Sequence, residues 1–205
     1  MAAFYKRLFR QLGYRRADIR LFTLQQRGAS PLQVDGQVYR LLDAADFTRD
    51  PIFAEKSRRA TYIARLGDGH QCHGHVGTDG AVASYQWISD GGMVAPFEAG
   101  LKLDVPAGHR YIWDCRTAAW AAGRGLYRHA LQTLAAETAY VKWIICEAGN
   151  AASARGILNA GFEPAGNLKI ICAGPFCLLQ DGLETVVCRS VTPLAFRHWG
   201  HAPQA

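Results

Sequence analysis

The residues best suited to chemistry lie between residues 111 and 162. The stretch YIWDCR at 111–116 has the aromatic and branched residues typical of a strand, and a loop then leads to Gly123, Gly125 and a helical pattern. Backbone N–H groups at the start of a helix lack intrahelical acceptors and lie at the positive end of the helix dipole. The glycine turn is therefore suited to hold phosphate oxygens, although such a turn can also serve only to pack a helix on a strand.

Apolar periodicity around this stretch predicts the elements that must position it. Apolar runs and alternations predict strands at 19–24, 37–42, 62–66, 73–76, 81–88, 111–116, 142–146, 169–172 and 185–191. Spacings of three and four residues predict helices at 44–59, 126–140 and 151–159, the last of which is stopped by Gly161. This order of elements predicts one mixed α/β domain built on a central sheet.

The composition is that of a folded globular chain. Of the 205 residues, 49% are hydrophobic and 20% are charged, which excludes a disordered chain. No apolar stretch reaches the ~20 residues that span a bilayer, and the first residues do not have the pattern of a secretory signal. The six cysteines contain no CxxC pair, so we expect reduced thiols in a cytoplasmic protein.

The net charge of +6 belongs to the N-terminal end. Residues 1–30 contain seven basic residues and only Asp18 as an acid, whereas residues 31–205 are neutral. A neutral body argues against a nucleic-acid-binding domain. We therefore expect a basic extension at 1–30, helical at its start, and a domain at 31–205. The apolar stripe in residues 1–16 allows docking on the domain, attachment to an anionic membrane surface, or a contact in a homodimer.

A second motif supports the anion site. Asn150 and Ser153 follow the predicted long helix, and Gly161 and Phe162 begin eleven residues after Asn150. Together with the glycine turn, this spacing resembles the GNAT superfamily of N-acetyltransferases, more loosely over residues 37–192. The resemblance implies a mixed α/β fold with a central, mostly antiparallel sheet. Helices flank that sheet, and it is splayed between its fourth and fifth core strands.

The resemblance implies transfer of an acetyl or other acyl group from acyl-CoA to a small amine, which attacks the thioester directly in a ternary complex. It implies a cofactor site formed by Cys115, Arg116, Thr117, Gly123, Arg124, Gly125, Leu126, Tyr127, Asn150 and Ser153. The chain differs from the family at Ala122, where relatives hold arginine or glutamine, and at Ile157, where many hold a proton-donating tyrosine. These differences favour one alternative, a catalytically inactive CoA-binding or regulatory module.

Proton transfer has several candidates. Glu147 is expected at the end of the strand beside the splay and Asp114 on the neighbouring strand, so either carboxylate, or a water relay, is a candidate for the general base. On a regular strand Asp114 and Arg116 share one face and can simply pair, while Tyr111 lies on the other face. Tyr111, at the position where some relatives hold a glutamate, and Tyr127 are the candidate proton donors.

The histidine-rich stretch at 70–75 does not predict a metal site. His73 and His75 share one face of a strand while Cys72 points to the other, and no second cluster completes a tetrahedral site. His75 is instead a candidate for the acceptor pocket. Trp87, on the next strand, is a candidate for the same pocket or for the core.

Overall fold

The computed structural model describes residues 14–24, 34, 36–54, 56–181, 184–189 and 193–195. Nine strands form one sheet in the order β11-β10-β9-β1-β8-β7-β4-β3-β2, and β5, β6 and β12 form a small second sheet. The strands are β1 (Arg15–Leu24), β2 (Gln37–Leu41), β3 (Gln71–Gly77), β4 (Val82–Asp90), β5 (Val94–Pro96), β6 (Lys102–Asp104), β7 (His109–Thr117), β8 (Val141–Glu147), β9 (Glu163–Ala173), β10 (Phe176–Asp181), β11 (Glu184–Arg189) and β12 (Leu194–Ala195). The helices are α2 (Ala44–Arg49), α3 (Lys56–Gly67), α4 (Leu126–Ala136) and α5 (Ala151–Asn159), with short 3-10 turns at Pro51–Phe53, Glu98–Gly100 and Ala119–Ala121.

The sheet opens between β7 and β8, its one parallel pair among the described strands. Their pairing ends at Ile112 and Ile144, but β7 continues to Thr117 and β8 to Glu147. All other neighbours in the large sheet are antiparallel. In the series β2, β3, β4, β7 and β8, the splay therefore separates the fourth and fifth strands, which confirms the predicted fold class.

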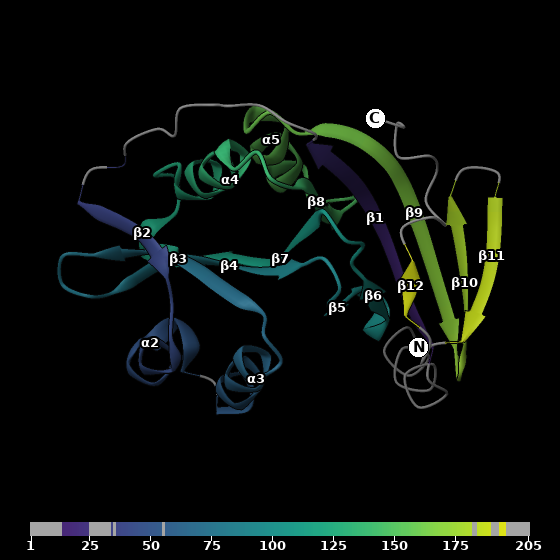
Figure 1. Cartoon of the computed structure of the whole chain (residues 1–205), viewed down its shortest axis with the longest axis horizontal. Helices are drawn as coiled ribbons and strands as arrows, with labels where there is room; N and C mark the ends of the chain where they lie inside the picture. The colour runs from purple at the N-terminus through teal and green to yellow at the C-terminus, as the bar shows by residue number, and fades with distance from the viewer. Residues whose placement is uncertain are drawn as a thin grey trace, which may run out of the picture.

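Strand β1 lies inside the large sheet, between β8 and β9 (Figure 1). Its Ile19 stands opposite Glu147 of β8 and also opposite Leu168 of β9. The expected division at residue 30 therefore cuts an internal strand away from its neighbours, so residues 15–24 are part of the sheet rather than of an appended segment. The helix predicted near residues 5–12 lies outside the described residues.

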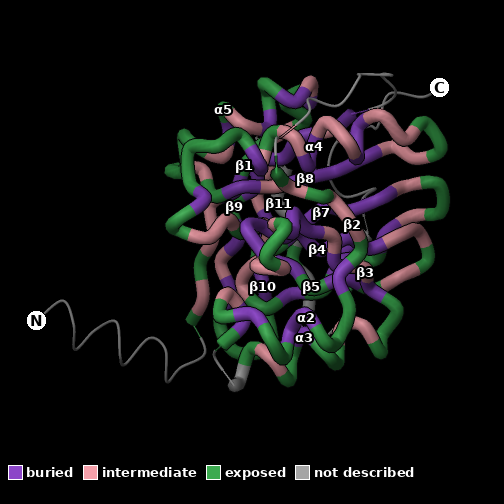
Figure 2. Tube along the Cα trace, turned by 90° about the vertical axis from the view of Figure 1, so that its left-hand side faces the viewer, coloured by how far each residue is buried: buried purple, intermediate pink, exposed green. Residues whose placement is uncertain are grey.

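Two pairs of helices cover opposite faces of the sheet (Figure 1). Helices α4 and α5 pack on one face through a core that includes Leu131, Leu134 and Ile157. Helices α2 and α3 lie on the other face, where Phe47 and Tyr62 are buried. Figure 2 shows that the buried positions follow the central strands. Among the described residues, no helix has the length and apolar character needed to cross a bilayer.

The connection between β2 and β3 differs from the prediction. The pattern predicted one helix at 44–59 and a strand at 62–66, but the structure has α2, the turn Pro51–Phe53 and then α3. Asp50 is extended, as the residue before a proline prefers to be, and its carboxylate accepts the backbone N–H of Ile52 at 2.9 Å. The apolar run at 62–66 belongs to α3 and faces the core on one side only.

Strands β9 and β10 are joined by a tight turn that brings two cysteines together. Cys172 and Cys177 are opposite each other in the register, and their sulfur atoms form a disulfide. The expectation that the thiols are reduced is therefore wrong for this pair. The spacing of five residues gave no motif, because only the hairpin register places the two side chains side by side. Cys72, Cys115 and Cys146 carry free thiols.

Lys142 is a buried cation on β8. Its side chain is 0% exposed, and its Nζ atom has no hydrogen-bond partner among the described residues. Burial lowers the pKa of Lys142, an effect that nearby Glu137 opposes. The charged form is therefore poorly solvated in the folded state, at a cost in folding free energy.

We expect Lys142→Met to raise the free energy of unfolding by about 1 kcal/mol or more at pH 7, because methionine has a similar volume and no charge to desolvate. Chemical denaturation measures this change. The control is Lys169→Met, since Lys169 is exposed on β9 and its loss should change the value by less than about 0.5 kcal/mol. Destabilisation by Lys142→Met would contradict the prediction.

Candidate active site

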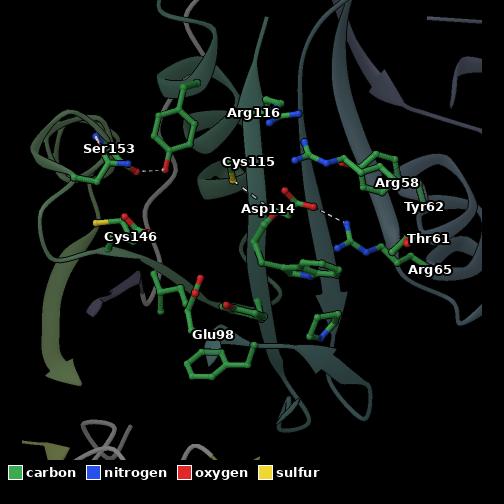
Figure 3. Close-up of a pocket in the computed structure, with 18 residues that line it drawn as sticks. Arg58, Thr61, Tyr62, Arg65, Glu98, Asp114, Cys115, Arg116, Cys146 and Ser153 are labelled. Carbon is green, nitrogen blue, oxygen red and sulfur yellow. Dashed lines mark hydrogen bonds and ion pairs between the residues drawn. The ribbon is translucent and has the colours of Figure 1, made fainter. Parts of the chain in front are cut away.

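A cavity of about 630 Å³ lies where β7 and β8 separate (Figure 3). It is bounded by α3 on one side and by α5 on the other, and the loop after β5 contributes a third wall. Its lining consists of Arg58, Thr61, Tyr62, Arg65, Pro96, Phe97, Glu98, Tyr111, Trp113, Asp114, Cys115, Arg116, Tyr127, Ile145, Cys146, Glu147, Asn150 and Ser153. The four predicted candidates for proton transfer, Tyr111, Asp114, Tyr127 and Glu147, are therefore brought to one cavity.

A bulge in β7 shapes this cavity. Asp114 has a φ of 43°, unusual for a residue with a Cβ. The register with β4 passes from Trp113 directly to Arg116, so Asp114 and Cys115 have no register partner in β4. The bulge breaks the alternation expected for a regular strand, in which Asp114 and Arg116 point away from Tyr111. The four residues from Trp113 to Arg116 instead line the same cavity as Tyr111.

Arg65 of α3 neutralises one carboxylate in this cavity. Its Nη1 atom lies 2.6 Å from Oδ2 of Asp114. Its guanidinium carbon is 4.4 Å from the ring centre of Trp113 and 5.1 Å from that of Trp87, distances at which a cation is attracted by an aromatic face. The expected pair of Asp114 with Arg116 is therefore replaced by a pair with Arg65, which the sequence gave no means of locating.

Two further carboxylates face the cavity with different surroundings. Glu147 is exposed at the end of β8. Glu98, in the turn Glu98–Gly100, is half-buried, and no sequence motif pointed to it. Burial raises the pKa of Glu98, and the negative charges of Glu147 and Asp114 raise it further. Tyr111 is buried, and burial raises the pKa of its hydroxyl well above the ordinary value.

Tyr127 is held at the α5 side of the cavity. Its hydroxyl lies 3.1 Å from Oγ of Ser153, and burial raises its pKa, so it keeps its proton at neutral pH. Asn150 caps α5 by accepting the backbone N–H of Ser153 at 3.0 Å. A Cβ at Gly156 would lie 2.9 Å from the ring of Tyr127, so a glycine is required there. Ile157 is 0% exposed in the core and cannot donate a proton to the cavity.

The glycine turn leads into α4 as predicted. Gly125 is the N-cap of α4 in the left-handed conformation, with a φ of 75°, and no side chain caps the helix. A Cβ built on Gly123 or Gly125 would have no atom within 4 Å, so the space beside the turn is open. Arg124 is exposed there and stacks over Trp120, whereas the side chain of Leu126 is buried and only its backbone is available.

The turn and Thr117 are not among the residues that line the main cavity. Thr117 and Arg116 border a smaller neighbouring cavity of about 400 Å³, beside Trp120. Of the ten predicted cofactor residues, the main cavity therefore gathers Cys115, Arg116, Tyr127, Asn150 and Ser153. Burial raises the pKa of Cys115, which disfavours a reactive thiolate.

The histidines lie elsewhere. His75 is 0% exposed, with Nδ1 2.8 Å from Oγ of Ser84 and Nε2 2.7 Å from Nδ1 of His129 on α4. It does not line the cavity, so its predicted place in an acceptor pocket is wrong, and Trp87 is a core residue. The part of the chain that the structure describes contains no group of three or more side chains able to hold a metal ion.

Solved structures share this fold. A protein of the GNAT acetyltransferase family from Novosphingobium aromaticivorans DSM 12444 matches with a TM-score of 0.50 and 20% identity, over 77% of this chain and 65% of its own length. A Drosophila protein matches with a TM-score of 0.52 and 15% identity, over 85% and 57%. A conserved protein of unknown function from Staphylococcus epidermidis ATCC 12228 matches with a TM-score of 0.52 and 10% identity, over 82% and 66%.

This chain therefore spans less than two thirds of the length of each of these three proteins. No protein-family model and no curated protein matches its sequence. The glycine turn, the Asn150 motif and the splayed sheet nevertheless agree with the structural likeness: the chain has the GNAT fold.

Proposed function

We propose that this protein is a CoA-dependent N-acyltransferase that moves an acetyl or other acyl group to a small amine. The observation that carries the proposal is the cavity between the separated ends of β7 and β8, because it joins a bulged strand to titratable groups from four other elements. Bound acyl-CoA would supply the activated thioester carbonyl. Residues of this chain would bind and orient the acyl-CoA and the amine, and would exchange protons with them.

The residues present fit such a donor. The uncapped start of α4 offers backbone N–H groups beside two glycines whose missing side chains leave open space, an arrangement suited to a pyrophosphate. The bulged residues Asp114 and Cys115 have backbone groups outside the β4 ladder, which are free to bind an extended pantetheine chain or an oxyanion. Arg116, at the carboxyl end of β7, adds a positive charge on the way to the turn.

Tyr127 is the proposed proton donor to the departing sulfur. It lines the cavity, keeps its proton at neutral pH and is oriented by Ser153. It would take the role for which the family pattern suggested the position of Ile157. Direct attack by the amine needs no covalent enzyme intermediate, so Cys115 is not assigned as a nucleophile.

Acetyl-CoA and a panel of primary amines test the proposal. We expect calorimetry to detect CoA binding, and a thiol-trapping dye to detect thiol release that depends on the amine. Binding without release for any acyl-CoA or amine would favour the alternative, an inactive CoA-binding module, which the buried Ile157 supports. Absence of both would contradict the proposed function.

Other expectations go with this proposal. We expect the protein to act in the cytoplasm on a small-molecule amine and not on nucleic acid. A contact of residues 1–16 with a membrane surface and a homodimer stay predictions. Vesicle sedimentation and analytical ultracentrifugation test them.

A further inference from the structure

Glu98 is the sheltered carboxylate of the cavity. It lies in the turn Glu98–Gly100, where Ala99 has a φ of 56° and Gly100 a φ of 72°, so a tight backbone turn presents its side chain to the cavity. Figure 3 shows Glu98 at one end of the cavity, with Arg116 and Arg58 toward the other and Asp114 between them. The two ends therefore differ in charge.

The three carboxylates of the cavity are not equivalent. Asp114 is committed to Arg65 by a 2.6 Å ion pair. Glu147 is exposed to solvent at the end of β8. Glu98 is half-buried, and its carboxylate forms no hydrogen bond or ion pair with a described residue. It is therefore the carboxylate best placed to take a proton from a bound group inside the cavity.

Resting on the proposed acyl transfer, we propose that Glu98 is the catalytic base for the acceptor amine, and that this acceptor is an amine without a carboxylate beside its nitrogen. Glu147 and Asp114 add negative potential around Glu98, which attracts an ammonium group. The same potential repels the α-carboxylate of an amino acid. The aromatic walls formed by Phe97, Tyr111 and Trp113 suit the apolar part of such an amine.

The step balances without a further reactant. Glu98 takes one proton from the ammonium, and the freed nitrogen forms a bond to the thioester carbonyl carbon. As the carbon–sulfur bond breaks, its electron pair leaves with sulfur, and Tyr127 donates a proton to that sulfur. The nitrogen then loses its second proton, which restores the hydroxyl proton of Tyr127. Glu98 then releases its own proton to solvent. The products are an amide, free CoA and one proton.

The first test compares Glu98→Gln with Glu147→Gln. Glu98→Gln should lower kcat roughly a hundredfold, within the range of general-base catalysis, and leave the Kd for CoA within twofold. Glu147→Gln should lower kcat far less than Glu98→Gln does, but it should raise the KM for the amine, because it removes negative charge from the cavity. It should also move the acid limb of the kcat/KM profile to lower pH, because the Glu147 charge helps to raise the pKa of Glu98. Glu163→Gln is the control and should leave activity unchanged, because Glu163 is exposed on β9.

The second test uses pairs of amines that differ by one carboxylate. Tyramine, putrescine and agmatine should each be acylated at least tenfold more efficiently than tyrosine, ornithine and arginine, respectively. Any of three results would overturn the proposal: near-normal turnover by Glu98→Gln, loss of turnover by Glu147→Gln, or preference for the amino acids. Calorimetry with CoA separates failure of this proposal from failure of the proposed function. A folded protein that does not bind CoA would refute the proposed function, whereas the three results above refute only the role of Glu98 and the choice of acceptor.

Discussion

Replacing Gly125 with tryptophan is expected to raise the Kd for CoA at least tenfold, a loss of about 1.4 kcal/mol in binding free energy. The space beside Gly125 is open, and its neighbours at the start of α4 have unsatisfied N–H groups. A large side chain there would fill the region in which phosphate oxygens must approach the backbone. Isothermal titration calorimetry measures the change.

The matched control is Gly174→Trp. Gly174 also has a positive φ and open space around it, but it lies in the turn between β9 and β10. Both variants therefore carry the same kind of backbone strain, and only Gly125→Trp should weaken CoA binding. Equal affinities in two folded variants would remove the phosphate site from the start of α4.

Local patterns predicted the half of the site that is continuous in the sequence. The strand at 111–116, the glycine turn and the helix begun by Asn150 all stand where their spacing placed them, because caps, turns and strand propensities act over a few residues. The same patterns predicted the fold class, since the order of these elements leaves few sheet arrangements.

The other half of the site depends on contacts between distant segments. The bulge at Asp114 changes which residues share a face, and a regular alternation of side chains could not reveal it. Glu98 follows the short strand β5, which has too few residues to give a periodic signal. Arg65 was placed in a predicted strand, although one helical face of α3 brings it to Asp114.

Local sequence patterns also could not predict the position of β1 in the sheet. The sequence predicted a strand at 19–24, but the excess of basic residues in 1–30 suggested a segment appended to the domain. Its pairing with both β8 and β9 depends on residues more than a hundred positions away. Charge composition reports where a segment meets solvent, and it does not report which strands the backbone joins.

Acid is expected to destabilise the protein between pH 6.5 and about pH 4 through His75. Burial, followed by the neighbouring His129, lowers the pKa of His75 from 6.5 to about 4. The unfolded chain therefore binds a proton in this range that the folded chain does not bind, so the free energy of unfolding falls as the pH falls. The loss is absent above pH 6.5 and reaches about 3 kcal/mol near pH 4.

The slope of the unfolding free energy against pH isolates this group from other acid-sensitive residues. His75→Gln keeps a side chain able to bond to Ser84 but cannot titrate, so its slope between pH 6 and pH 4.5 should be smaller than that of the wild type by up to about 1.4 kcal/mol per pH unit. NMR titration gives a second measurement on the unaltered protein, in which the His75 ring should stay neutral to about pH 4. Equal slopes for the two proteins, or a His75 ring that takes its proton near pH 6.5, would show that burial and the neighbouring His129 do not hold His75 in its neutral form.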